Sequence, residues 1–223
     1  AVLELFPDAQ IAIGPAIENG FYYDFDLPRP LTDADLETIT KNMRKIINSG
    51  REFVRKEVTR EEAKEIFKNQ KYKLELLEAI PEGETVTTYT QGSFTDLCRG
   101  PHVESTKELC ADGFKLLSIA GAYWRGNEKN KMLTRIYATA WGSKEDLRAY
   151  MDHLADIEKR DHRKLGKELD LFSLHEEAGP GLVYWHPRGA RIRQTIEQFW
   201  REEHYKNGYE MVYTPHVGKS WLW

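Results

Sequence analysis

The sequence predicts an α+β protein: a largely antiparallel sheet with packed helices, followed by a long helix that leads into a second domain. Runs of β-branched and aromatic residues alternate with capped helical patterns, which is typical of strands and helices that share a core. With 40% hydrophobic residues, a chain of 223 residues can bury a sizeable core. The composition changes after Trp141, where a mostly charged helical pattern begins and marks a domain boundary.

Up to Trp141 the elements follow from apolar spacing and from capping residues. The chain opens like the end of a helix that is closed by a proline. Thr32 or Asp33 can cap the next helix and Gly50 ends it, while Thr59 and Glu62 form a capping box for a third. Helices are therefore expected over residues 1–6, 32–49, 60–67 and 72–80. Strands are expected over residues 10–13, 20–25, 53–58, 85–90, 114–120 and 132–140.

Beyond Trp141, Ser143 caps a long helical pattern that continues to about residue 169. Its distal part, residues 159–167, is mostly charged, and a helix that bridges two domains has this composition. The charge run fits either a solvated helix face or a face turned toward RNA. A strand at residues 182–185, a helix at 189–205 and a proline-terminated strand at 210–215 should follow.

Charge and cysteine content restrict the class of protein. The net charge is −4, so nucleic-acid binding would require a local basic patch. Two cysteines, Cys98 and Cys110, are too few for a disulfide framework and indicate free thiols in a reducing cytoplasm. No apolar run reaches the roughly 18 residues that a membrane-spanning helix needs. We therefore expect a cytoplasmic protein with no membrane partner.

The segment DLCRGPH at residues 96–102 is the strongest candidate site in the sequence. Asp96, Cys98 and His102 lie close together, and a turn at Gly100 and Pro101 separates the thiol from the imidazole. These side chains can bind an amine, ligate a metal or activate a water. Cys98 and His102 supply only two metal ligands, so we expect no bound metal in this chain.

Four segments together resemble the bacterial-type threonyl-tRNA synthetases: IGPAIENGFYYD at residues 13–24, DLCRGPH at 96–102, AGAYWRG at 120–126 and KRDHRKLG at 159–166. The resemblance covers essentially the whole chain. It implies that residues 1–141 are the editing domain without its N-terminal part, that 142–169 are the linker helix, and that 170–223 begin the class II catalytic domain.

The resemblance also implies an activity and partners. The parent enzyme joins threonine to its tRNA with ATP, and the editing domain hydrolyses seryl-tRNA(Thr) that was formed in error. ATP, magnesium and zinc are expected only in the complete catalytic domain. The tRNA(Thr) acceptor end is the expected partner, and the region 191–215 is expected to form a homodimer.

Site roles follow from the same resemblance. Lys73, Asp96 and His102 are expected to be catalytic, and Tyr23 and Cys98 to bind substrate. Asp96 could hold the α-ammonium, Lys73 could stabilise the oxyanion, and His102 could position water or the terminal ribose. The candidates for RNA contact are Arg99, Arg125, Arg163 and Lys164.

Two alternatives stay open beside the editing hydrolase. In the family, the Cys-x-x-x-His half of the site is paired with a His-x-x-x-His half on an upstream helix, which this sequence does not include. The chain could therefore be a catalytically incomplete tRNA-binding or structural fragment. A zinc protein built on Cys98 and His102 is the third possibility.

Overall fold

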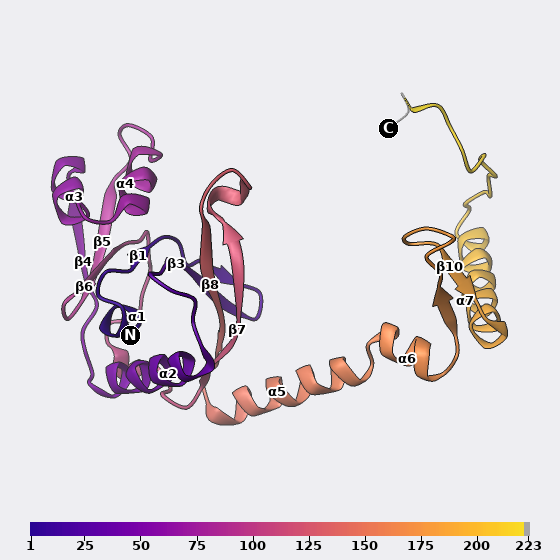
Figure 1. Ribbon diagram of the computed structural model, residues 1–223, viewed down its shortest axis with the longest axis horizontal. Helices are drawn as coiled ribbons and strands as arrows, with labels where there is room; N and C mark the ends of the chain where they lie inside the picture. Colours follow the sequence, from indigo (N-terminus) through magenta and orange to yellow (C-terminus); the bar gives the residue numbers. More distant parts are fainter. Residues whose placement is uncertain (221–223) are drawn as a thin grey trace. The chain divides into compact units, whose positions relative to one another are not determined.

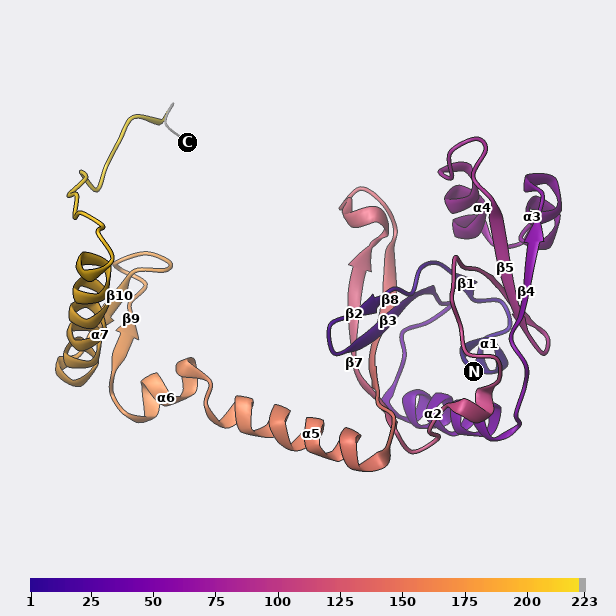
Figure 2. The same cartoon turned by 180° about the vertical axis from the view of Figure 1, so that it is seen from behind.

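The structure, a computed structural model, describes residues 1–220. The chain divides into two compact units, one of residues 1–151 (unit 1) and one that begins at Asp152 (unit 2), and each is described by itself. Figure 1 and Figure 2 show the elements from opposite sides. The expected α+β class is confirmed, because every strand pairing in the described residues is antiparallel and helices pack beside the sheets.

A large antiparallel sheet forms the centre of unit 1. Its strands, in spatial order, are β1 (Gln10–Ile11), β3 (Gly20–Asp26), β8 (Met132–Ala140) and β7 (Phe114–Tyr123), and β2 (Ala16–Ile17) also pairs with β3. The helix α2 (Asp33–Asn48) packs on this sheet together with α1 (Val2–Leu5), as Figure 1 shows. Their shared core consists of Val2, Phe6, Ala9, Ile11, Phe25, Ile39 and Ile136.

The ends of α2 are those that the sequence predicts. Thr32 and Asp35 form a reciprocal capping box, and the Arg29 guanidinium donates two hydrogen bonds, of 2.6 and 2.8 Å, to the Asp35 carboxylate. The helix stops before Gly50, whose φ of 65° lies in the left-handed region that glycine enters without strain.

A small antiparallel sheet lies beside the large one and carries two short helices. Its strands are β4 (Val54–Val58), β5 (Val86–Gln91) and β6 (Phe94–Leu97), in that order. The helices α3 (Arg60–Ile66) and α4 (Lys71–Glu78) pack on it around a core of Val58, Ala63, Phe67, Leu77 and Val86. The predicted capping box of Thr59 and Glu62 opens α3.

The helix α4 also contacts the large sheet. Tyr72 packs against Trp124 and Leu133 in a third buried cluster, at the end of the β7–β8 hairpin. That hairpin turns through the short 3-10 helix η2 (Trp124–Gly126), and a second one, η1 (Thr106–Glu108), lies beside α2. Because α4 packs on both sheets, its position depends on both.

Two helices stand where the sequence predicts one long helix. They are α5 (Lys144–Lys159) and α6 (His162–Glu168), and Ser143 caps α5 as expected, with its hydroxyl accepting a 3.0 Å bond from the Asp146 N–H. Asp161 interrupts the pattern, because its carboxylate accepts a bond from the Arg163 N–H and opens α6. An aspartate in this position favours a new helix start over continuation.

In unit 2, β9 (Phe172–Leu174) and β10 (Val183–Trp185) form a hairpin that is followed by α7 (Pro187–Lys206). The His186 imidazole bridges the Asp170 carboxylate, at 2.7 Å, and the Ser173 hydroxyl, at 2.8 Å, and so ties the start of α7 to β9. One face of α7 exposes a stripe of large apolar side chains: Ile192, Ile196, Phe199 and Trp200.

The strand predicted for residues 210–215 is not formed in the structure, and this prediction is wrong. A strand is held by hydrogen bonds to a neighbour, and no strand lies beside this segment in the described part of the chain. The β-branched and aromatic composition indicated a strand, but composition does not supply a partner.

We expect Ile39→Ala to lower the free energy of unfolding of unit 1 by about 2–5 kcal/mol, because it deletes a fully buried side chain between α2 and the large sheet. Urea unfolding of the chain, followed by far-UV circular dichroism, measures this effect. Ile66→Ala is the matched control, since Ile66 is a helical isoleucine that is 45% exposed, and it should cost only about 0.5 kcal/mol. Equal losses in the two variants would contradict this account of the core.

Candidate active site

Five of the residues that the sequence singles out form one cluster in unit 1. Tyr23 comes from β3 of the large sheet and Lys73 from the first turn of α4. Asp96 lies on β6 of the small sheet, Cys98 follows that strand, and His102 comes after the turn. We refer to these five residues as the cluster. Segments that are far apart in sequence therefore supply its side chains.

The centre of the cluster is a buried three-way contact. The Lys73 ammonium lies 2.5 Å from Asp96 Oδ1 and donates a 3.0 Å hydrogen bond to the Tyr23 hydroxyl. That hydroxyl donates to Asp96 Oδ2 at 2.5 Å. The Lys73 side chain is only 3% exposed, so the Asp96 carboxylate compensates a charge that water does not reach.

Burial changes the acidity of two groups in the cluster. It lowers the pKa of Lys73 below that of a solvated lysine, although the neighbouring Asp96 carboxylate acts in the opposite direction. Burial, together with the same carboxylate, raises the pKa of the Tyr23 phenol. Tyr23 therefore remains a hydrogen-bond donor, whereas Lys73 releases its proton more readily than a lysine in water.

Cys98 and His102 form the second part of the cluster. His102 Nε2 lies 3.1 Å from Cys98 Sγ, which also accepts a 3.3 Å bond from the Gly100 N–H. The imidazole lies between two aromatic rings: it is stacked on Phe53 at 5.4 Å between centroids and meets Tyr89 edge-on at 4.3 Å. Contacts on three sides thus fix the orientation of an exposed histidine.

The turn between the two residues fits only glycine. Gly100 has a φ of 73°, and a Cβ atom there would lie 2.1 Å from the Tyr89 hydroxyl oxygen. The following peptide bond to Pro101 is cis. The sequence predicts a turn at this point, and the structure confirms it.

The extended chain at the end of β6 connects the two parts of the cluster. The Cys98 N–H donates a 3.2 Å bond to the Thr87 carbonyl of β5, so Cys98 continues the strand and lies on the same face as Asp96, two positions earlier. In its charged form, Cys98 would favour the protonated forms of Tyr23 and Lys73 and so act to raise the pKa of each. The structure therefore brings together Tyr23, Lys73, Asp96, Cys98 and His102.

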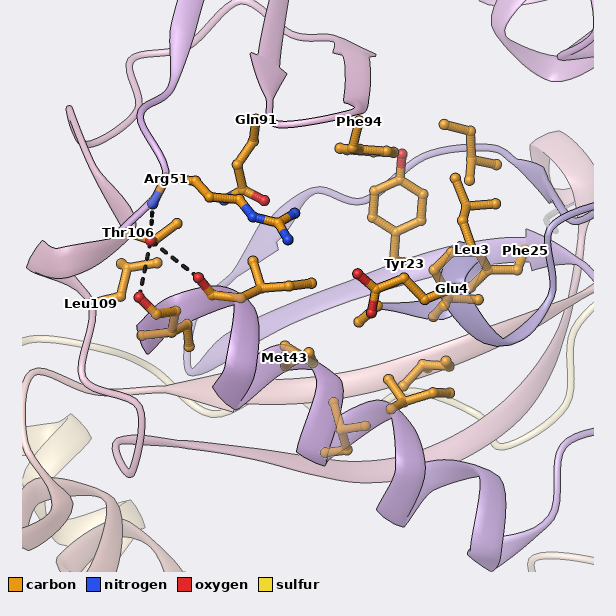
Figure 3. A pocket seen from close by; sticks show the side chains of 18 of the residues that line it. Leu3, Glu4, Tyr23, Phe25, Met43, Arg51, Gln91, Phe94, Thr106 and Leu109 are labelled. Atoms are coloured by element: carbon orange, nitrogen blue, oxygen red, sulfur yellow. Dashed lines mark hydrogen bonds between the residues drawn. The ribbon is translucent and has the colours of Figure 1, made fainter. Parts of the chain in front are cut away.

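A largely apolar cavity of about 500 Å³ borders the cluster (Figure 3). Its walls are the inner face of α2, the large sheet, α1 and the turn between β5 and β6, and Tyr23 is the one cluster residue in its lining. The Tyr23 ring thus lines the cavity while its hydroxyl joins Lys73 and Asp96. Arg51, Gln91 and Glu4 add polar groups, and Figure 3 shows them around the ring.

Two of the predicted RNA-contact residues lie in unit 1. Arg99 is 89% exposed and pairs with Glu84 at 3.2 Å across the surface. Arg125 adopts a positive φ of 55° and donates a 3.2 Å bond to the Glu75 carbonyl of α4. Arg125 therefore has a structural contact that its position in a polar loop did not indicate.

The other two RNA candidates lie in unit 2. The Arg163 guanidinium is bound to the Asp161 carboxylate at 2.6 Å, which fixes it at the start of α6. Lys164 is exposed on the same helix. Their contact with RNA stays a prediction, as it does for Arg99 and Arg125.

Phe53, Tyr89 and Gln70 belong to the surroundings of the cluster, and sequence reasoning did not identify them. Phe53 directly precedes β4 and Tyr89 lies on β5, and aromatic side chains are ordinary in and beside strands, so nothing in the pattern separates them from core positions. Gln70 is the N-cap residue of α4, and its contacts lie 59 and 61 positions away in the sequence. Spacing along the chain gives no signal for contacts of this range.

The residues of the cluster do not fit a metal centre. Cys98 and His102 offer two ligands, whereas structural zinc takes four and catalytic zinc usually takes three from the protein. Within residues 1–220, no group of three or more His, Cys, Asp or Glu side chains is arranged to hold a metal ion.

Among the same residues, no helix is both long and apolar enough to cross a membrane.

Comparison with known proteins agrees with the resemblance seen in the sequence. Residues 86–137 match the family described as "Threonyl and Alanyl tRNA synthetase second additional domain". The whole chain is 56% identical to the threonine–tRNA ligase of Borrelia recurrentis (strain A1), 55% to that of Borrelia turicatae (strain 91E135) and 56% to that of Borreliella burgdorferi (strain ZS7). The alignments cover 100% of this chain and 38% of each relative, so the chain spans well under half of their length.

We expect Asp96→Asn to destabilise unit 1 by about 3–5 kcal/mol near neutral pH, because it leaves the buried Lys73 ammonium without its counterion. The loss should shrink as the pH rises. Without Asp96 the pKa of Lys73 falls further below the value of 10.5 in the unfolded chain. Between these two values the unfolded state binds more protons than the folded state, so stability increases with pH.

Urea unfolding at several pH values from about 7 to 10 tests this dependence. Glu84→Gln is the control, because it breaks the exposed pair with Arg99 and should change stability by only about 0–1 kcal/mol. A loss in Asp96→Asn that is independent of pH, or no loss, would contradict the role assigned to the ion pair.

Proposed function

Since this chain is related to the threonine–tRNA ligases from its first residue to its last, we propose that unit 1 supplies the editing function of such an enzyme. In this function, seryl-tRNA(Thr) is hydrolysed to serine and free tRNA. The observation that carries the proposal is the cluster, in which a buried lysine, a carboxylate and a phenol lie beside a thiol–imidazole pair.

The need for a second, hydrolytic site follows from the chemistry of the two amino acids. Threonine and serine differ by one methyl group, and a binding pocket gains only roughly 1–3 kcal/mol from such a difference. Serine, being smaller, enters any pocket that accepts threonine. A separate site that hydrolyses the serine ester, and that the threonine methyl does not fit, removes the error.

Asp96 is the group that would bind the α-ammonium of the seryl ester. A carboxylate offers about four lone-pair positions, and Asp96 uses three of them, for Lys73, the Tyr23 hydroxyl and the Leu97 N–H. One position remains for a charge-assisted bond from the substrate. Tyr23 would hold Asp96 in place, and its ring would pack against the substrate from the side of the cavity.

Lys73 and His102 would act on the ester itself. Water attacks the carbonyl carbon, the bond to the ribose oxygen breaks, and a proton from the water passes to that oxygen. The Lys73 ammonium, which is desolvated and fixed, would stabilise the oxyanion that forms during the attack. His102, which is exposed and held by two aromatic rings, would position the water or the terminal ribose.

Water is the proposed nucleophile despite the nearby Cys98 thiol. An acyl-enzyme on the sulfur would create a second ester-like bond that also needs hydrolysis. A ribose ester is already reactive toward water that is held in position. Cys98 would instead orient His102 through their contact of 3.1 Å.

The remaining functions concern the whole enzyme. We propose that residues 170–223 begin its class II catalytic domain. The complete domain would join threonine to tRNA at the expense of ATP and would bind magnesium and zinc. The enzyme would act in the cytoplasm. The acceptor end of tRNA(Thr) would reach the cluster. Four basic residues would contact the phosphates of the tRNA: Arg99 and Arg125 of unit 1, and Arg163 and Lys164 of unit 2. Neutralisation of phosphates by such residues makes binding weaken with salt.

In the whole ligase that contains this chain, we expect Lys73→Ala and His102→Ala to slow seryl-tRNA deacylation by roughly ten- to ten-thousand-fold. Asp96→Ala should weaken the binding of the amino-acid ester, and Cys98→Ala should cost less than His102→Ala. Single-turnover deacylation of seryl-tRNA(Thr) measures these effects, with Lys129→Ala on the exposed turn between β7 and β8 as the matched control.

Threonylation by each variant should remain, because that reaction belongs to another domain. Full deacylation by both Lys73→Ala and His102→Ala, with wild-type threonylation, would refute the editing site and leave a tRNA-binding or structural part. A seryl-thioester trapped on Cys98 would refute water as the nucleophile.

We also propose that α7 forms a homodimer contact in the region 191–215. Its exposed apolar stripe supports this, because Ile196 and Phe199 are 62% and 64% exposed. In the whole ligase, Ile196→Asp should raise the dimer dissociation constant by roughly tenfold or more in sedimentation experiments. Gln194→Asp, on the same helix, is the control. Unchanged dimerisation in Ile196→Asp would contradict the proposal.

A further inference from the structure

Two glutamines join α4 to the edge of the large sheet by an exchange of side-chain hydrogen bonds. The Gln70 amide accepts a 2.8 Å bond from the Ile11 N–H and donates a 3.2 Å bond to the Ala9 carbonyl. In return, Gln10 Oε1 accepts a 3.1 Å bond from the Lys71 N–H. The Gln70 side chain thus contacts the backbone of β1 as a neighbouring strand would.

The exchange gives hydrogen-bond partners to backbone groups at the edge of the large sheet and at the start of α4. The Ile11 and Ala9 side chains are buried, at 3% and 0% exposure, so water does not readily replace Gln70 there. The Lys71 N–H belongs to the first turn of α4, where helical N–H groups have no partner within the helix. Gln70 itself, although it is the N-cap residue, makes no capping bond with its side chain.

A helix as short as α4 depends on such external contacts. It spans 8 residues, which is less than an isolated helix needs for stability in water. Lys73 lies in its first turn, three residues after Gln70, and reaches Asp96 and Tyr23 at 2.5 and 3.0 Å. A shift of the helix start by about 1 Å would break contacts of this length and could lower a rate by about a hundredfold.

The other polar contacts of α4 do not replace this exchange. Lys71 and Tyr72 both bind the Asp26 carboxylate, at 2.9 and 3.0 Å, and Glu75 accepts a 2.7 Å bond from the Trp124 indole. These bonds involve side chains at both ends, so rotamer changes can accommodate a shift of the helix. Arg125 and Arg60 do bind the α4 backbone, at the Glu75 and Leu77 carbonyls at 3.2 and 3.0 Å, but these carbonyls lie in the second half of the helix and not at its start. The Gln70 bonds end on the backbone at Ile11 of β1 and at Ala9 just before it, and so set the start of α4 relative to the large sheet. In that sheet β1 pairs with β3, the strand that carries Tyr23.

We propose that Gln70, supported by Gln10, is a positioning residue that holds Lys73 against Asp96 and Tyr23 for the hydrolysis of seryl-tRNA. The inference rests on the proposed editing function. Gln70 does not touch the substrate and acts only through Lys73. Its contribution should therefore appear in the turnover rate and in the ionisation of Lys73, and not in the binding of tRNA.

Gln70→Met is the sharpest variant, because methionine keeps the size of the side chain and removes both hydrogen bonds. In the whole ligase, it should lower the maximal single-turnover deacylation rate by roughly tenfold to a hundredfold and leave the half-saturating tRNA concentration within about twofold. Gln70→Glu should lie between Met and wild type, since a carboxylate still accepts from the Ile11 N–H but cannot donate to Ala9. Lys129→Met, on the exposed turn between β7 and β8, is the control.

A second readout does not require activity. When α4 loosens, water reaches the Lys73 ammonium, and its lowered pKa rises toward the ordinary value of lysine. The groups that face it, Asp96, the Tyr23 hydroxyl and Cys98, remain in place. At a pH above the ordinary lysine pKa, where the amine is unprotonated in both proteins, the greater access should speed labelling of Lys73 by an amine-specific reagent in Gln70→Met, measured by peptide mass spectrometry. The rise in pKa should shift the lysine limb of the pH–rate profile to higher pH.

The outcomes separate this inference from the proposed function. Wild-type deacylation and wild-type labelling in Gln70→Met, together with an inactive Lys73→Ala, would overturn the positioning role and leave the editing site intact. A slow Gln70→Met that has also lost helical circular dichroism signal would overturn it too, because Gln70 would then only support folding. Full activity in Lys73→Ala would overturn the catalytic role of Lys73, and the positioning role with it; full activity in His102→Ala as well would overturn the editing site itself.

Discussion

The ion pair between Lys73 and Asp96 is the constraint on which the rest of unit 1 depends. An ammonium that is 3% exposed is tolerated only beside a carboxylate, and the two residues belong to different elements, the helix α4 and the strand β6 of the small sheet. Tyr23 adds a third element, because its hydroxyl bonds to both partners. The large sheet, α4 and the small sheet must therefore meet at one point. The three hydrophobic clusters of unit 1 provide the stability that keeps these charged groups together.

The apolar cavity beside α2 and the cluster of reactive groups share only Tyr23. The cavity is mostly apolar and can bind an uncharged surface, whereas the cluster offers a carboxylate, an ammonium and an imidazole. Tyr23 serves both, through opposite ends of one side chain. The lining of this cavity includes only one of the five cluster residues, so the cavity alone would not have identified the site. The chemistry of the groups identifies the site more reliably than the volume beside it.

What the sequence could predict was largely local. The capping box at Thr59 and the glycine that follows α2 are contained in a few neighbouring residues, and so is the turn that brings Cys98 to His102. The contact between Tyr23 and Asp96 joins positions 73 apart, and no spacing rule anticipates it. The segment 96–102 indicated Asp96 by itself, whereas only the family resemblance added Tyr23 to the site. Two predictions of secondary structure failed because a single contact, present or missing, decides whether the element forms. Residues 210–215 have the composition of a strand but no partner, and Asp161 begins a new helix where charge patterning alone suggested continuation.

The close approach of Gly100 to Tyr89 restricts how this site can change by mutation. Any side chain at position 100 would meet the phenol oxygen and would also have to adopt a left-handed backbone. A smaller residue at position 89 would relieve the first obstacle but would remove one of the two rings that hold His102. The two positions are thus coupled, and the order in which they are substituted matters. If the specificity of this site changed during evolution, we expect the substitutions to occur in the residues around the turn, while the turn itself stayed unchanged.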